Sequence, residues 1–314
     1  MPHLLMAVCN LSTLPEFYTF MKTKMSLFVV FVLSMALTFV IHGQGRRSNR
    51  SMNVNISRDR VVTDCADIRI EYNGLPAATG QAELSLPASQ VSTLRSHLTN
   101  GGIYLSGWDR MEYSVKTCKA VPADDPNTSD TLSRISTSVV GGELAVNGPS
   151  DRDWTANLIV MAPRLTKLDL ETRNGPLELR DLAGVIHVVA TNGPVGLNNV
   201  GGSVDATTTN GPIHLKGASG DQRLTAANGP IHVELSGSRW DGPGLEVSTK
   251  NGPLSLSVPD GYSSGISVQT SGRSPVRCKA ALCSGLTNFA GVVRLGNGDP
   301  VVKLSTGNGP LSIE

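Results

Sequence analysis

The sequence predicts an all-β, single-chain β-solenoid, similar to a right-handed β-helix, with coils of about 18 residues and an irregular N-terminal β cap. Three observations lead to this prediction: a tripeptide recurs, its central steps are equal, and alternating apolar residues flank each copy. Charged residues make up 17% of the 314 residues and aromatic residues 4%, with 33 Gly and 18 Pro. Such a composition favours short strands and many turns over helices.

The tripeptide is Asn-Gly-Pro, and it begins at Asn174, Asn192, Asn210, Asn228, Asn251 and Asn308. The differences 192−174, 210−192 and 228−210 are each 18, whereas 251−228 is 23 and 308−251 is 57, close to three units. Positions four and two residues before the asparagine, and three and five after it, are small or apolar. Alternate strand residues point to one side, so these columns should share an interior. A second corner is expected at Gly184, Gly202 and Gly220.

Two architectures have this pattern: an antiparallel meander with Asn-Gly hairpins, and a solenoid whose units stack on one another. The proline distinguishes them, because the residue after Gly in a two-residue hairpin donates its N–H across the turn and proline has none. Proline fits the first residue of a strand or a bend. The solenoid is therefore preferred, with rungs about 4.8 Å apart. Its stacked asparagines would form an amide ladder that builds corners and binds no ligand.

The N-terminal residues predict export. Residues 22–45 read KTKMSLFVVFVLSMALTFVIHGQG, with a basic start, an apolar stretch and a small polar exit, as in a secretory signal peptide. We expect residues 1–20 to be a gene-model extension before a start at Met21, 21–45 to be a signal peptide or N-terminal anchor, and 46–60 to be a linker. An uncleaved segment would anchor the chain through residues 26–41. The expected location is the periplasm or the cell surface.

Residues 61–164 are expected to form the irregular β cap and the first coils, and residues 165–314 the repeat proper. Residues 68–72 alternate like a half-buried strand, and 154–161 are a second strand-like run. Between them, residues 122–133 are rich in Asp, Pro, Ser and Thr, which predicts an exposed loop. Residues 99–105 and 147–149 are degenerate copies of the repeated phrase, and no strand pattern directly follows the second.

Four cysteines follow the signal segment, and an even number in an exported chain suggests disulfides. Cys278 and Cys283 are close enough in sequence to staple a loop, which leaves Cys65 with Cys118. Free buried thiols are the alternative. The spacing is not that of a zinc site, because no C-x-x-C occurs and no histidine flanks the pairs.

The phrase [Thr/Ala]-x-Asn-Gly-Pro-[Ile/Leu/Val]-x-[Leu/Val], repeated behind a signal peptide, resembles the bacterial putative-adhesin β-strand-repeat family, formerly a domain of unknown function. The resemblance covers residues 165–314 well and residues 92–165 loosely. It implies an extracytoplasmic β-solenoid and offers no catalytic residues to carry over.

The outward column five residues before each asparagine holds Asp169, His187 and Asp205 and continues with Arg223 and Glu246. Neighbouring opposite charges would form a solvated ladder. Alternatively, Asp169 and Asp205 would stand about 9.6 Å apart by strand spacing. That separation is close to the range of about 5–9.5 Å that a glycosidase needs, so an enzyme remains an alternative.

Three further side chains admit two interpretations. His214 and His232 should be stacked neighbours, with Glu178 two rungs away, and could hold a metal or simply face solvent. Trp240, in the insertion of the fourth interval, could stack on a sugar or cover the edge of the core. The formal net charge of +1 gives no case for nucleic acid, which needs a basic stripe.

The sequence therefore predicts a non-enzymatic extracytoplasmic protein without a cofactor, an adhesin or envelope scaffold, with a cell-surface glycan or an envelope protein as its partner. One alternative is a carbohydrate-active β-helix enzyme that uses the Asp169/His187/Asp205 face. The other is a periplasmic docking partner in envelope sensing. A concave groove with paired carboxylates would favour the enzyme, and a flat charged ladder would favour the scaffold.

Overall fold

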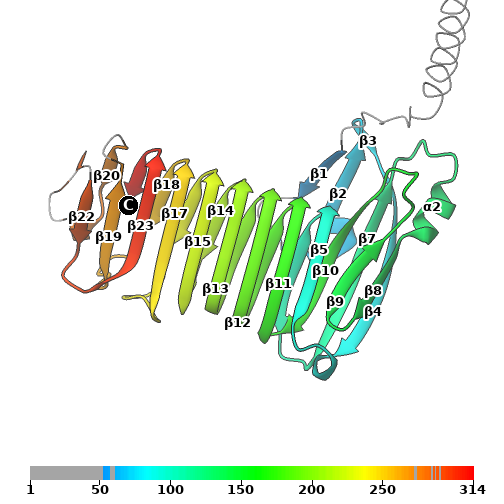
Figure 1. Cartoon of the computed structure of the whole chain (residues 1–314), viewed down its shortest axis with the longest axis horizontal. Helices are drawn as coiled ribbons and strands as arrows, with labels where there is room; N and C mark the ends of the chain where they lie inside the picture. Colours follow the sequence, from blue (N-terminus) through cyan, green and yellow to red (C-terminus); the bar gives the residue numbers. More distant parts are fainter. Residues whose placement is uncertain (1–51, 57–60, 272–273, 284–285, 287, 290) are drawn as a thin grey trace, which may run out of the picture. The chain divides into compact units, whose positions relative to one another are not determined.

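The computed structural model describes residues 52–56, 61–271, 274–283, 286, 288–289 and 291–314. The predictions for residues 1–45, including the signal peptide, the anchor and the start at Met21, lie outside the described residues. Within these ranges the fold is all-β, with a single short α-helix, α2 (Thr128–Arg134) (Figure 1). No helix among them is long and apolar enough to span a bilayer.

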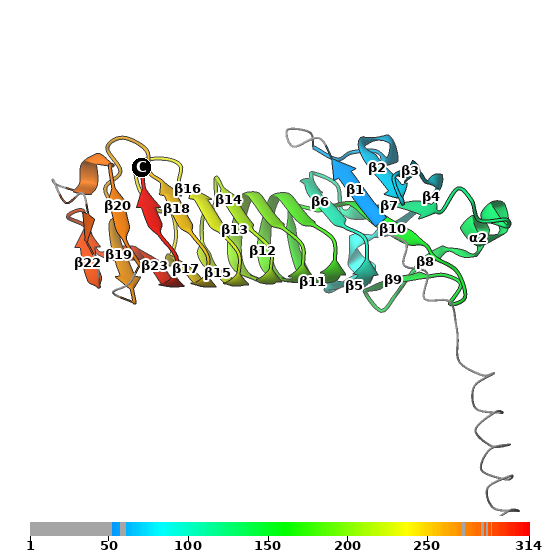
Figure 2. The ribbon, with the colours of Figure 1, turned by 90° about the horizontal axis from the view of Figure 1, so that it is seen from above.

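The repeat units form rows of parallel strands. Strands that precede the Asn-Gly-Pro phrase pair with their counterparts one unit on, and strands that follow it do the same. The elements are β11 (Leu165–Asn174), β12 (Leu177–Asn192), β13 (Val195–Asn210), β14 (Ile213–Lys216), β15 (Asp221–Asn228), β16 (Ile231–Glu234), β17 (Gly244–Asn251) and β18 (Leu254–Ser257). Asn174 lies opposite Asn192, and Asn210 opposite Asn228. This register is that of the 18-residue period, and its parallel direction excludes an antiparallel meander for these units (Figures 1 and 2).

The four inward columns are buried, which confirms the predicted interior. For example, Leu170, Val188, Ile213 and Leu256 are at most 1% exposed. Each such aliphatic side chain stabilises the fold by about 1.5–3 kcal/mol on burial. In the column of Thr and Ala residues, the buried threonine hydroxyls have hydrogen-bond partners. They donate to the carbonyl oxygens of corner glycines. These bonds join Thr172 to Gly101, Thr208 to Gly193, Thr249 to Gly229 and Thr306 to Gly252.

In the first units of the repeat, the second corner begins before the predicted glycines. Asp181 and Asn199 have φ of 53°, a left-handed conformation that Asn and Asp adopt more readily than other residues with a side chain. Gly184 and Gly202 follow, with φ of 133° and 88°. A Cβ on either glycine would overlap the backbone of the neighbouring rung, so the close stacking there requires glycine.

The leading region, residues 61–164, contributes one rung to the array. This rung consists of β5 (Leu94–Asn100), which pairs in parallel with β11, and β6 (Ile103–Trp108), which pairs in parallel with β12. The rest is irregular: β4 (Ala78–Pro87), β7 (Glu112–Val121) and β10 (Thr155–Pro163) are antiparallel neighbours, and β8 (Ser136–Val140) with β9 (Glu143–Asn147) is a hairpin. Short 3₁₀ turns are η1 (Cys65–Asp67), η2 (Ala88–Gln90) and η3 (Ala281–Cys283).

Two expectations for this region were wrong. Residues 52–56 belong to a strand, β1 (Met52–Ile56), and not to a linker; β1 pairs antiparallel with β2 (Ile68–Tyr72), which in turn pairs with β3 (Leu75–Pro76). The apolar Met52 and Val54 alternate with polar residues and pack on a second core cluster that includes Tyr104. In the predicted loop 122–133, α2 forms because the Asp125 carboxylate accepts bonds from the Asn127 N–H and the Thr131 hydroxyl.

The C-terminal residues depart from chain order. The strands are β19 (Gly265–Thr270), β20 (Val276–Cys278), β21 (Asn288–Phe289), β22 (Val292–Leu295), β23 (Pro300–Asn308) and β24 (Leu311–Ile313). β23 lies between β17 and β19, so the last rung of the sequence stacks directly on the rung that begins at Gly244 (Figure 1). The 57-residue step therefore corresponds to one rung of stacking, with the intervening residues placed beyond it.

Candidate functional site

The asparagine corners form a ladder of side-chain amides with a single direction. Each Nδ2 donates to the Oδ1 of the asparagine on the preceding rung, at 2.9–3.1 Å. The chain of bonds runs from Asn308 through Asn251, Asn228, Asn210, Asn192 and Asn174 to Asn100. Each internal amide uses its carbonyl oxygen and one N–H inside the ladder, so the column is well suited to holding rungs in register.

The column that contains Asp169, His187 and Asp205 is a ladder of alternating charge. Parallel pairing orders it as Arg95, Asp169, His187, Asp205, Arg223, Glu246 and Lys303. His187 Nδ1 lies 3.0 Å from Asp169 Oδ1, and the Asp169 and His187 side chains are 53% and 52% exposed. Such exposed pairs contribute about 0–1 kcal/mol each. The two aspartates thus lie on an open strand surface, one on each side of a histidine.

A hollow of about 820 Å³ lies over a different column, four residues after the asparagines. Register places Tyr104, Glu178, Gly196 and His214 on successive rungs of this column. Gly196 leaves a gap, and the Glu178 carboxylate lies over it, because a Cβ built on Gly196 would overlap that carboxylate. The remaining lining residues are Val54, Val61, Val62, Leu105, Ser106, Pro176, Arg180, Pro194 and Pro212. We call this space the Gly196 hollow.

The surroundings of the Gly196 hollow shift the pKa values of three of its polar side chains. Burial raises the pKa of Glu178, against the opposing effect of the neighbouring Arg180 charge. Burial, followed by the charge of Glu178, also raises the pKa of Tyr104. Tyr104 is 4% exposed, and its hydroxyl has no hydrogen-bond partner among the described residues. Partial burial and then the charge of His232 lower the pKa of His214, although its side chain reaches solvent.

The predicted histidine neighbours are stacked on adjacent rungs. The rings of His214 and His232 have centroids 5.0 Å apart and an interplanar angle of 12°. His232 Nδ1 lies 2.6 Å from Ser255 Oγ. Within the described part of the chain, no group of three or more His, Cys, Asp or Glu side chains is placed to hold a metal ion. His214 lines the Gly196 hollow, and His232 lies one rung further along the array.

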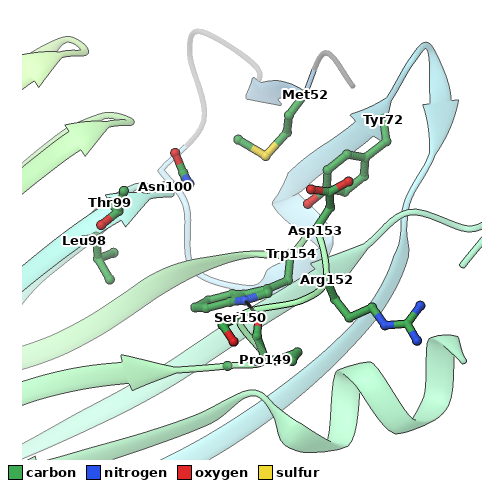
Figure 3. A pocket seen from close by; sticks show the side chains of 11 residues that line it. Met52, Tyr72, Leu98, Thr99, Asn100, Pro149, Ser150, Arg152, Asp153 and Trp154 are labelled. Atoms are coloured by element: carbon green, nitrogen blue, oxygen red, sulfur yellow. Dashed lines mark hydrogen bonds between the residues drawn. The ribbon is translucent and has the colours of Figure 1, made fainter. Parts of the chain in front are cut away.

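Trp154 is one of the residues that line a second hollow, of about 450 Å³ (Figure 3). The indole N–H donates to the Pro149 carbonyl oxygen at 2.9 Å, and one part of the ring packs so closely on Gly148 that a Cβ there would overlap it. The degenerate phrase at residues 147–149 therefore holds a tryptophan and is outside the amide ladder. Asn100, where the ladder ends, lines the same hollow. We call it the Trp154 hollow. The sequence predicts a strand-like run here and does not indicate a recess.

The remaining predicted positions are structural in character. Trp240 is 7% exposed, and its indole N–H donates to the Gly220 carbonyl oxygen at 2.9 Å, so it covers the edge of the core and is not an exposed sugar platform. Disulfides join Cys65 to Cys118 and Cys278 to Cys283. The first links η1 to β7, and the second closes the short loop after β20.

No protein-family model matches the chain, and no curated protein matches it. Among solved structures, it is similar to a putative cell adhesion protein from Clostridium sporogenes, with 12% identity and a TM-score of 0.30 over 75% of this chain and 99% of that one. A putative adhesin from Bacteroides fragilis matches with 10% identity and a TM-score of 0.38 over 75% and 97%. One from Parabacteroides merdae matches with 8% identity and a TM-score of 0.36 over 74% and 96%.

Proposed function

We propose that the chain is an exported, non-enzymatic binding protein, an adhesin or envelope scaffold, whose repeat units form a right-handed β-solenoid. The observation that supports this most is the alternating charged column. Asp169 pairs with His187, and Arg223 with Glu246 at 3.3 Å, along an open strand surface. A glycosidase needs two carboxylates around one bond, in a recess that holds the substrate. The Gly196 and Trp154 hollows are lined by other residues.

The parallel, in-register rungs support the solenoid. In-register pairing recurs from the rung at residues 94–108 to the rung at residues 300–313, and amide bonds connect its corners. Contacts in such an array connect each rung chiefly to its neighbours, which gives a long rigid surface. Loops and irregular segments on a rigid scaffold are where binding residues concentrate. We therefore place partner binding, to a cell-surface glycan or an envelope protein, where irregular segments adjoin the array or a column is interrupted.

Binding and turnover measured on the same glycans test this proposal. The purified chain and its Asp205→Asn variant would be applied to a glycan array, and the bound glycans would then be incubated with protein and analysed for cleavage or elimination products. We expect binding without turnover, with equal binding by both proteins. Turnover that disappears in Asp205→Asn would overturn the proposal and establish the enzyme alternative.

A further inference from the structure

We propose that the Gly196 hollow is a binding site for a neutral polyhydroxylated ligand, a short segment of glycan, held by Glu178, Arg180 and His214 against a row of prolines. This inference rests on the proposed binding function and assigns its site and ligand class. The hollow's volume of about 820 Å³ falls within the range of about 300–1,000 Å³ that is typical of ligand sites.

One position in the wall of the hollow lacks a side chain. The neighbouring members of the column, from Tyr104 to His232, all carry large side chains except Gly196. Its backbone does not have a left-handed φ, so glycine is not required there by conformation. The atom that a Cβ would meet is the end of the Glu178 side chain, which can move. Gly196 therefore makes room for the Glu178 carboxylate at the floor of the hollow and is not required by the corner geometry of the array.

The polar lining favours hydroxyl groups over charged groups. Glu178 supplies acceptors, Arg180 supplies donors, and His214 supplies one or the other at each ring nitrogen. A hydroxyl both donates and accepts, so one sugar can engage all three side chains. Glu178 and Arg180 are groups of opposite charge, so the lining offers neither an anion nor a cation a set of partners of one sign. The buried Tyr104 hydroxyl, without a partner among the described residues, is a further group that a ligand hydroxyl or a trapped water could satisfy.

The apolar lining fits the other side of a sugar. Pro176, Pro194 and Pro212 follow one another on consecutive rungs, so their rings repeat at the strand spacing of about 4.8 Å. Val61 and Val62 also line the hollow, from the segment between β1 and β2. A sugar ring has C–H groups on its faces, and these can lie on the proline and valine surfaces while its hydroxyls meet the polar column. The hollow therefore combines the apolar wall and the few convergent polar groups of a small-ligand site.

The test is isothermal titration calorimetry on the full chain with neutral hexose and N-acetylhexosamine oligosaccharides, and with their uronic acid and glucosamine counterparts. Gly196→Ala adds one methyl group at the floor and displaces Glu178, and we expect it to weaken binding of the neutral oligosaccharides by roughly tenfold or more. Glu178→Gln keeps the shape and hydrogen-bonding capacity, and we expect a smaller loss. Trp154→Ala, in the Trp154 hollow, is the matched control and should bind like the wild type.

The outcomes separate this site from the general function. If Gly196→Ala binds normally while Trp154→Ala does not, the assignment of the site is overturned and the proposed function stands. Preference for the acidic or basic oligosaccharides overturns the ligand class. If no oligosaccharide binds, the inference fails, and the proposed function fails with it only if envelope proteins are not bound either. Thermal melting of Gly196→Ala near the wild-type temperature would show that lost binding is not due to unfolding.

Discussion

The repeat array and the leading region are both β structure, but different interactions hold them together. In the array, each rung repeats the same buried columns, corner glycines and amide bond, and it contacts chiefly the next rung. In the leading region, antiparallel strands β4, β7 and β10, a second core cluster and the Cys65–Cys118 disulfide replace that regularity. The repetition makes the array predictable from the sequence, whereas the irregular segments form hollows in the surface.

The two hollows lie at irregular places: one where the two regions meet, and one within the leading region. The Gly196 hollow is lined by array residues together with Val61 and Tyr104 of the leading region. The Trp154 hollow is lined by leading-region residues around Asn100, the first amide of the ladder. A regular column pairs its own side chains from rung to rung, so groups that can meet a ligand are found at its interruptions and at its end.

The largest loss of stability is expected on removal of the disulfide in the leading region. The comparison is with the disulfide in the C-terminal segment between Asn251 and Asn308, which we call the C-terminal excursion. Cys65 and Cys118 are 53 residues apart, and Cys278 and Cys283 only 5. Since loop entropy grows with the length of the closed loop, replacing both members of the first pair by Ser should lower the free energy of unfolding by about 4 kcal/mol, and of the second by about 2 kcal/mol. Urea unfolding without reductant measures both values. Equal losses would show that the leading region does not depend on its disulfide in this way.

The next effect should distinguish glycines of the array from glycines of the leading region. A Cβ on Gly211 would overlap the Gly193 carbonyl oxygen in the preceding rung, and backbone cannot move aside as a side chain can. We expect Gly211→Ala to cost about 3 kcal/mol. Gly80 in β4 is the control, since a Cβ there would be 3.7 Å from Leu132, an ordinary contact. Gly80→Ala should be neutral or stabilising by about 0.4–1 kcal/mol, as measured by urea unfolding. A tolerated Gly211→Ala would contradict the tight stacking of corners.

The difference between the regions also explains what could be predicted from the sequence. The period fixes which residues align, so the buried columns and the stacking of Asn174 to Asn251 follow from arithmetic and strand alternation. The contact between Asn251 and Asn308 does not follow, because the excursion between them lies beyond the last rung and leaves no mark on the period. Two roles are compatible with the sequence around Trp240, because that sequence does not show what the side chain packs against.

The sequence does not predict the two hollows, for the same reason. Gly196 is visible in the sequence as a gap in its column, but a gap on an open strand would not form a recess. The recess depends on β6 supplying Tyr104 to the same column and on Val54 and Val61 approaching from the other side. These contacts join aperiodic segments far apart in the chain, so neither spacing nor alternation predicts them.

Substitutions in the amide ladder should cause a moderate loss of stability, which measures how much the ladder stabilises the array. Asn210 accepts a bond from Asn228 at 3.1 Å and donates one to Asn192 at 2.9 Å. Asn210→Ala removes both links and should lower the free energy of unfolding by about 1–2 kcal/mol. Asn308→Ala removes only the link to Asn251, so its loss should be about half as large. Thermal and urea unfolding, with oligosaccharide titrations in parallel, give the comparison. Lost binding with unchanged stability would show that the asparagine column is a binding surface.

The smallest effect on stability is expected from the ionisation of Glu178, which lies where the two regions meet. Burial raises the pKa of Glu178 above its usual 4.5, while Arg180 on β12 acts in the opposite direction. Between the usual pKa and the raised one, the folded chain binds more protons than the unfolded chain, so the free energy of unfolding falls as pH rises through that window. Glu178→Gln carries no titrating group and should lack this fall, as urea unfolding between about pH 4 and pH 8 would show.

The control for Glu178 is His214, whose pKa is shifted in the opposite direction. Partial burial and the charge of His232 lower the pKa of His214 below its usual 6.5, so the folded chain resists protonation there. The free energy of unfolding should therefore fall as pH decreases below about 6.5, and His214→Gln should weaken that dependence. Tyr104 on β6 stays protonated over this range, because burial and Glu178 raise its pKa. The two variants should thus change opposite slopes, and identical pH profiles for Glu178→Gln and wild type would show that the carboxyl is solvated and the hollow is open.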